Sequence, residues 1–517
     1  MMTCRMTSLF PSTRRLAFML AVWILGLGTA SADQADRGQS LAEAFRNPSD
    51  AARPAIYWVW VNGNTDPERL TFDLREMKDK GISAAYIFDV GARDPQGVVP
   101  EGPAFMGPES LEAIGHAIRE AERFGIEVGY VSSSSWNAGG TWVPPKFASM
   151  ALYKSEVTAE GPAEFDEALP FPDVPKTCPR GDDGLPEFYR DVAVIAFPAS
   201  EEKTIEDDSA VVDLTDRLGG DGRLKWDVPK GRWQILRLVC TNTGQRLAIP
   251  SPNSQGLAID HFNPEATEFH FDYLIDLLHK EIGDFRKTPL KYMYVCSYEL
   301  RGLIWTPDLV ERFRVRWGYD LTPWLPVLFD YTIGGEEKTA RFNYDFDKTI
   351  GDLLVDAFYR RARDISNEAG LLLVAEAGGP GAPTHNVPVD ALKAQGVIDI
   401  PRGEFWNQHR LWVVKETACA AHIYGKPIVD MESFTSWRHW LDGPYELKPL
   451  ADRAMCGGTN HFTFHTWGHS PPEAGLPGWV YHAGTQVNPN LAWWPMAGAF
   501  IDYLSRCSSM LQRGVFV

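Results

Sequence analysis

The chain has 517 residues, of which 44% are hydrophobic and 23% are charged, so it can bury a large core and has the composition of a globular protein. Its formal net charge of −18 at pH 7 argues against nucleic acid and anionic membranes as partners, because an acidic surface repels both. The 18 tryptophans are unusually many, and such flat apolar rings either fill a core or stack on sugar rings.

The first 32 residues have the pattern of a secretory signal peptide. Arg14 and Arg15 precede an apolar run, and the small residues at 30–32 offer a cleavage site. The run is short for a membrane span, so the sequence predicts an exported protein, periplasmic or extracellular, without a membrane anchor. Cleavage removes three arginines and no acidic residue, which takes the formal net charge from −18 to −21.

Apolar runs and helical patterns alternate in the first part of the mature chain. The runs are apolar throughout, which is typical of parallel strands buried on both faces. Between the first two runs, Leu70, Leu74 and Met77 recur at helical spacing before Gly81. The pattern predicts strands at 55–61, 83–91 and 126–134 and helices at 66–81 and 109–125.

The alternation stops between residues 140 and 255. Helical periodicity is weak there, and the apolar runs at 190–198 and 231–244 are typical of strands. The sequence therefore predicts an inserted β-sandwich-like module over residues 140–255.

The strand and helix alternation resumes after this module. It predicts helices at 263–283, 306–318 and about 340–369, and strands at 292–296, 371–379, 397–406, 426–434 and 460–468. Together with the first three, these make eight strands of one type. The expected fold class is α/β, a (β/α)8 barrel formed by residues 33–139 and 256–517.

Carboxylates follow the predicted strands at the end where such barrels carry their chemistry. The residues are Asp89, Glu299, Glu376, Glu404 and Glu432. Four glutamates packed at consecutive strand ends repel one another, so some of their pKa values must rise or a cation must lie among them. Such a set can cleave glycosidic bonds by acid and base catalysis, or it can hold a metal ion.

Aromatic and polar residues near the same barrel end favour a sugar ligand. The histidines at 461, 465 and 469 are spaced by four, but the residues between them are strand-like, which argues against a shared metal ion. The predicted substrate-binding residues are Asn62, Asn64, Asp89, Trp136, Trp305, Trp406, His465, Trp467 and Trp494, and Trp437 and Trp493 fall in the same loops.

A series of ordered motifs resembles glycoside hydrolase family 106, the α-L-rhamnosidases, over roughly residues 55–512. They include WVNGN (60–64), SYE (297–299), DIPRGEFW (399–406), ESFTS (432–436) and a long segment at 447–469. The resemblance implies hydrolysis with inversion, with Glu299 as general acid and Glu432 as general base. It also implies Ca²⁺ at the active site, and Glu404 and Glu376 are the expected protein ligands because acid and base catalysis leaves them without a role.

Family members continue past the barrel into further β-rich domains. This chain stops at LQRGVFV, soon after the last predicted barrel helix, so we expect those domains to be missing.

The main hypothesis is an exported enzyme that removes α-L-rhamnosyl residues from glycans or glycosides by inversion. It predicts carboxyl groups roughly 6.5–9.5 Å apart, with Glu299 protonated through a raised pKa and Glu432 ionised. Two alternatives remain open. A retaining glycosidase would hold the pair about 5–5.5 Å apart, and a non-catalytic remnant would bind carbohydrate without turnover.

Overall fold

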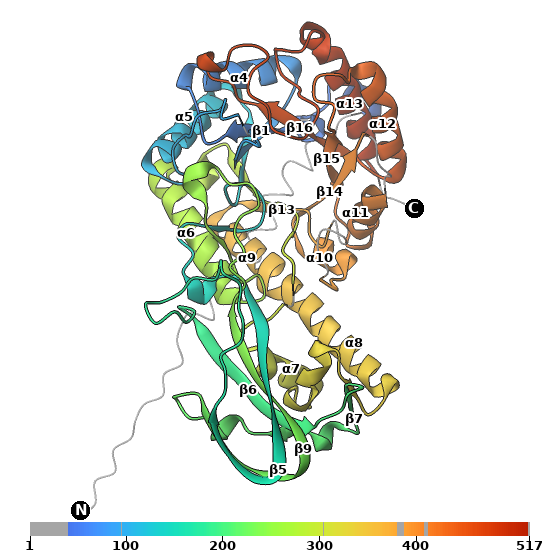
Figure 1. Ribbon diagram of the computed structural model, residues 1–517. Helices are drawn as coiled ribbons and strands as arrows, with labels where there is room; N and C mark the ends of the chain where they lie inside the picture. The colour runs from blue at the N-terminus through green and yellow to red at the C-terminus, as the bar shows by residue number, and fades with distance from the viewer. Residues whose placement is uncertain (1–39, 95, 303, 380–386, 408–411, 515–517) are drawn as a thin grey trace, which may run out of the picture.

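The computed structural model describes residues 40–94, 96–302, 304–379, 387–407 and 412–514. The predicted signal peptide at 1–32 lies outside these residues. Figure 1 shows a barrel with surrounding helices and, beside it, a lobe that contains β5, β6, β9, α7 and α8. Within the described ranges, every helix is too short or too polar to cross a membrane.

Eight parallel strands close into the barrel, which confirms the predicted (β/α)8 fold. Each predicted strand is present, and the bounds differ from the expected ones by only a few residues. In chain order the strands are β1 (Ala55–Val61), β2 (Ala84–Val90), β3 (Glu127–Val131), β11 (Leu290–Val295), β13 (Leu372–Ala375), β14 (Ile400–Trp406), β15 (Asp430–Thr435) and β16 (His461–Gly468). Strand β16 pairs with β1 and closes the ring.

Alternate residues of each strand face opposite sides, and this period decides what the barrel encloses. In β1, Tyr57 and Val59 pack into the interior cluster, whereas Trp58 packs outward against the helices. Both faces are therefore apolar, which explains the unbroken hydrophobic runs in the sequence.

The helices around the barrel begin and end at residues suited to those positions. At the start of α4 (Pro67–Lys80), the Asp66 side chain accepts a hydrogen bond from the Arg69 amide, and Gly81 ends the helix at φ 94°. The other helices of the barrel are α3 (Leu41–Arg46), α5 (Pro108–Phe124), α6 (Pro264–Ile282), α9 (Arg361–Ala369), α10 (Ala391–Val397), α11 (Trp412–Ile423), α12 (Pro444–Gly457) and α13 (Ala497–Leu511).

The inserted module forms one antiparallel sheet, in contrast to the predicted sandwich. Its strands, in spatial order, are β5 (Met150–Ala168), β9 (Arg223–Asn242), β6 (Tyr189–Pro198) and β8 (Val212–Asp213). One face of this sheet packs against a helical segment that was expected to belong to the barrel, η7 (Thr322–Phe329) and the residues after it. Phe197 of β6 lies edge-on to Tyr331 with ring centroids 5.0 Å apart. The helices therefore take the place of a second sheet.

Residues far apart in the sequence build this lobe together. Helices α7 (Leu309–Trp317) and α8 (Glu336–Leu353) belong to the same lobe in Figure 1. The short strands β7 (Thr204–Ile205) and β12 (Thr332–Ile333) pair in parallel and join the two parts. At the base of the module, β4 (Gly139–Gly140) pairs with β10 (Leu257–Ala258), so the chain leaves and rejoins the barrel at one place.

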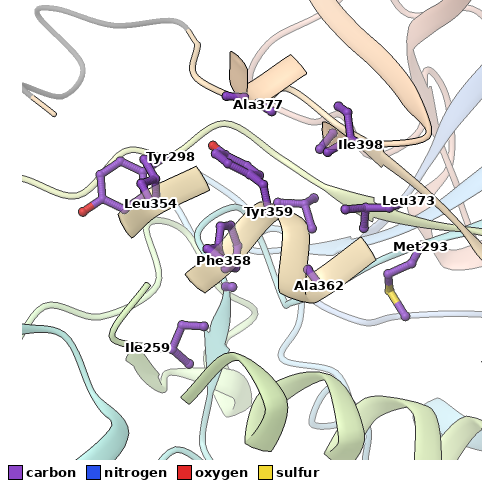
Figure 2. Packing of buried hydrophobic residues seen from close by; sticks show 14 of the residues in the cluster. Ile259, Met293, Tyr298, Leu354, Phe358, Tyr359, Ala362, Leu373, Ala377 and Ile398 are labelled. Atoms are coloured by element: carbon purple, nitrogen blue, oxygen red, sulfur yellow. The ribbon is translucent and has the colours of Figure 1, made fainter. Parts of the chain in front are cut away.

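A π-helical turn connects the lobe to the barrel. The predicted helix at 340–369 consists of α8, the π-helix η8 (Leu354–Arg360) and α9 without a break. Figure 2 shows Phe358 and Tyr359 of η8 among buried side chains from several elements, including Met293 of β11 and Leu373 of β13. The Tyr359 hydroxyl accepts a hydrogen bond of 3.3 Å from the Gly378 amide, which follows β13.

Candidate active site

A cleft of about 240 Å³ opens at the carboxyl ends of the barrel strands. The predicted glutamates Glu299, Glu376, Glu404 and Glu432 all line it. Glu404 of β14 and Glu432 of β15 are directly opposite each other in the parallel register, so their side chains leave the sheet on the same face. The period of the strands, and not only their order, therefore brings these carboxyl groups together.

Glu299 is held by residues from two loops. Trp136 Nε1 donates a hydrogen bond of 2.8 Å to Glu299 Oε2, and the Ser297 hydroxyl donates one of 2.9 Å to Oε1. The Glu299 amide donates to Asn137 Oδ1 at 2.9 Å. The loop after β3 thus fixes the position of a carboxyl group that follows β11.

Glu432 is mostly buried, with 12% of its side chain exposed, and it has a hydroxyl and an imidazole as neighbours. The Thr435 hydroxyl donates a hydrogen bond to Glu432 Oε1, and His465 Nδ1 lies 3.7 Å from the same oxygen. Burial raises the pKa of Glu432 to about 7, and the hydrogen bond from Thr435 opposes part of that rise. Burial therefore disfavours the ionised form that a general base requires.

Glu376 and Glu404 have raised pKa values for the same reason. Burial is the main cause for both, and the charge of Glu432 adds to it, so that the pKa of Glu404 rises to about 8 and that of Glu376 rises well above its usual range. The hydroxyls of Tyr57 and Tyr294 donate to Glu376 Oε1, and Trp406 Nε1 donates to Glu404 Oε2 at 3.2 Å.

These carboxyl groups have the hard oxygen atoms that Ca²⁺ prefers, and a divalent cation would offset their mutual repulsion. However, within the part of the chain that the structure describes, no three His, Cys, Asp or Glu side chains converge closely enough to form a metal site on their own. The residues fit a cation that takes some of its ligands from elsewhere, such as water or sugar hydroxyls, and they do not fit a closed protein cage.

A buried ion pair lies inside the barrel, on the same two strands as Glu404 and Glu432. Arg402 and Asp430 are fully buried and lie 2.6 Å apart on the interior face of β14 and β15. The guanidinium also stacks over the rings of Tyr86 and Tyr294 and donates to the Tyr57 hydroxyl at 3.2 Å. Arg402 and His461 hold the pKa of Asp430 well below its usual value despite its burial.

Three predicted substrate-binding residues line the cleft together with the glutamates: Trp136, Trp406 and His465. Trp406 and Trp437 pack with ring centroids 5.1 Å apart, and His482 lies 5.9 Å from Trp437. Trp437 is 51% exposed, so its ring remains available to a ligand. These rings form an aromatic wall on which a sugar face can stack.

Three predicted tryptophans belong to the core and not to the cleft, which corrects the sequence-based assignment. Trp305 is fully buried beside Phe346, and Trp467 packs edge-on against Trp494. Trp467 has the same parity as His465 and should share its face. The pairing of β16 with β1 shifts register between Phe464 and Trp467, which turns Trp467 outward.

Asn62, Asn64 and Asp89 also lie outside the described lining of the cleft, and they hold the surrounding loops. The Asn62 side chain accepts from the Ala92 amide at 2.7 Å, and both asparagines donate to the Pro100 carbonyl. Asp89 accepts hydrogen bonds from Ser134 and Ser251. These polar residues at strand ends therefore have a structural role. Their positions in the sequence alone do not distinguish this role from substrate binding.

The cleft also contains residues that the sequence did not single out. Arg93, Tyr481 and His482 line it, and Arg93 carries the only full positive charge among the described lining residues. These side chains come from the loops after β2 and β16, which have no recognisable spacing. Thr435 could have been found, because it follows Glu432 by three residues within the ESFTS motif.

Two known proteins are similar to this chain, one in sequence and one in fold. A protein of Formosa agariphila named "Putative beta-glucuronidase" is 30% identical over 535 residues, which cover 97% of this chain and 44% of the relative. The structure of a rhamnosidase from Novosphingobium sp. PP1Y superposes with a TM-score of 0.81 at 24% identity, over 92% of this chain and 61% of that one. This chain thus spans less than two thirds of the length of either protein.

The family comparison covers the barrel and the lobe alike. The model of glycoside hydrolase family 106, described as alpha-L-rhamnosidase, matches residues 46–209 and 198–517. These ranges include all four glutamates of the cleft and the aromatic wall. The chain belongs to glycoside hydrolase family 106, the α-L-rhamnosidase family.

Proposed function

We propose that this protein hydrolyses α-L-rhamnosides with inversion at the anomeric carbon. The observation that carries the proposal is the arrangement of Glu299 and Glu432 in one cleft beside an aromatic wall. Both named relatives are glycosidases by name, which supports a glycoside as the substrate class.

The two carboxyl groups have different surroundings that suit different roles. Glu299 is held by two donors and is partly exposed, so that it can protonate the oxygen of the departing group. Glu432 is buried next to the cleft and, once ionised, can take a proton from the water that attacks the sugar. Stacking on Trp406 and Trp437 would hold the substrate between them.

Proton NMR of the first sugar released from a rhamnoside tests this proposal. Inversion gives β-L-rhamnose as the first product. Retention would support the retaining alternative, and the absence of turnover in a folded sample that still binds rhamnose would support a non-catalytic carbohydrate-binding protein.

We further propose that one Ca²⁺ binds at Glu404, with Glu376 as a second ligand. The bound ion would stabilise negative charge in the cleft and contact sugar hydroxyls. Dialysis against EDTA should abolish activity, and Ca²⁺ should restore it better than Mg²⁺, because a site completed by sugar and water oxygens is too irregular for Mg²⁺. Calorimetric titration of Ca²⁺ into the Glu404→Gln variant should give weaker binding than with the wild type. Full activity in a sample shown by elemental analysis to be metal-free would contradict this proposal.

We also propose that the protein is exported after cleavage between Ala32 and Asp33. The pattern of Arg14, Arg15 and the apolar run supports it. Mass spectrometry of the periplasmic and secreted fractions should find a mature chain that begins at Asp33. Recovery of chains that begin only at Met1 would contradict it.

A further inference from the structure

His465 is a buried imidazole in the cleft without a hydrogen-bond partner at Nδ1. The residue is 5% exposed and lines the cleft from β16. The rings of Tyr57 and Tyr481 contact it edge-on, with centroids 5.5 and 5.4 Å away, and fix its orientation. Among the described residues, no donor or acceptor pairs with its buried Nδ1 atom. A buried polar atom in this state is costly, which indicates that a bound molecule satisfies it.

The position of Glu432 identifies that molecule. The distance from His465 Nδ1 to Glu432 Oε1 is 3.7 Å, which is too long for a direct hydrogen bond and short enough for one water to contact both atoms. Burial lowers the pKa of His465 to about 3, so the ring is neutral and one of its nitrogens can accept a hydrogen bond. When the ring proton is on Nε2, Nδ1 is the acceptor. Glu432 Oε1 and His465 Nδ1 are then two acceptors that face the same space.

We propose that His465 is a positioning residue that holds the attacking water against Glu432. The water donates one hydrogen bond to Glu432 Oε1 and the other to His465 Nδ1, which leaves an oxygen lone pair directed at the anomeric carbon. This inference rests on the proposed inverting function, in which a water must occupy a fixed place beside the base.

The chemical step conserves atoms and charge. The water oxygen forms a bond with the anomeric carbon while the bond to the glycosidic oxygen breaks. One proton of the water passes to Glu432, and Glu299 gives its proton to the departing oxygen. His465 exchanges no proton with the reactants, and its contribution is the orientation of the water.

Two substitutions of similar shape distinguish the role of Nδ1 from that of Nε2. The amide of His465→Asn replaces Nδ1 in position, whereas the amide of His465→Gln reaches the place of Nε2. We expect His465→Ala and His465→Gln to lower kcat on an aryl α-L-rhamnoside by about 10²-fold, the loss typical of a misplaced reactant. His465→Asn should retain kcat within about tenfold of the wild type, and KM and rhamnose binding measured by calorimetry should change little in all three.

The control is His439→Asn, because His439 also has a buried Nδ1 without a partner but lies outside the described lining of the cleft. Its kcat should remain within about twofold of the wild type, as for a substitution away from the chemistry. Circular dichroism and the melting temperature verify folding of each variant.

Several results would overturn the inference. Activity retained by His465→Gln and lost by His465→Asn would assign the role to Nε2 and thus to sugar binding. A loss confined to KM and rhamnose affinity would do the same, and equal kcat in all variants would leave His465 without a role in catalysis. Failure of the proposed function is distinguishable, because the wild type would then release no rhamnose or release the α-anomer first.

Discussion

Replacing Glu432 or Glu299 with glutamine should lower kcat on a natural rhamnoside by about 10²- to 10⁴-fold, the usual contribution of a general acid or base. Glutamine preserves the shape of each side chain, so the melting temperature should change little. The Glu299→Gln variant should recover part of its rate on an activated aryl rhamnoside, whose leaving group needs little protonation. The Glu432→Gln variant should not recover, since attack by water still requires a base.

The pH profile adds a second test of Glu432. A base works only when it is ionised, and burial raises the pKa of this group to about 7. The kcat/KM of the wild type should therefore rise with pH as Glu432 ionises, at a lower pH when Ca²⁺ is bound nearby, and Glu432→Gln should lack this dependence. Glu473→Gln, at an exposed position in the loop after β16, is the control and should have wild-type kinetics. Wild-type rates on the natural substrate for either cleft variant would exclude the assigned role.

Replacing Arg402 with methionine should destabilise the protein by about 3–5 kcal/mol, the cost of removing one partner from a fully buried ion pair. Asp430 would keep a buried charge whose described partners are the Thr463 hydroxyl, the His461 imidazole and the Met431 amide. The tyrosine rings would also lose the cation that packs over them. Calorimetric unfolding should show the loss as a lower melting temperature.

A double substitution separates the cost of the unpaired charge from the value of the pair. Arg402→Met with Asp430→Leu should be less destabilising than Arg402→Met alone, because no uncompensated charge remains. Arg341→Met removes a surface ion pair whose arginine is 76% exposed, and it should leave the melting temperature unchanged. An equal melting temperature for Arg402→Met and the wild type would show that the pair is not needed for stability.

The barrel could be predicted from the sequence because its strands are buried on both faces. Continuous apolar runs such as 55–61 indicate such strands, and four of the predicted strands carry a glutamate at or just after their ends. The four glutamates were found for this reason. Their side chains come together because alternate residues of a strand point to opposite faces. Glu404 and Glu432 are paired in register, so both point to the same face.

The remaining parts depend on features that leave no trace in a linear pattern. The register shift in β16 changes the face of Trp467, and a bulge of this kind has no sequence signature here. The helical periodicity of α7 and α8 shows that each buries one face, but it does not say against what. For that reason they were assigned to the barrel, although they pack in the lobe. Asn62 and Asp89 resemble binding residues in type and place, and only their hydrogen bonds reveal that they hold loops.

The π-helical turn at Leu354–Arg360 sets the rotational phase between the two ends of one continuous helix. Each residue of an α-helix advances the chain by about 100° and 1.5 Å, and a π turn holds one residue more than an α turn. If the same residues formed a regular α-helix, the extra residue would rotate α8 by about 100° around the helix axis relative to α9. The face of α8 that carries the buried Phe342 and Phe346 would then no longer point into the lobe. The orientation of the lobe is in this sense encoded in the length of one helical turn.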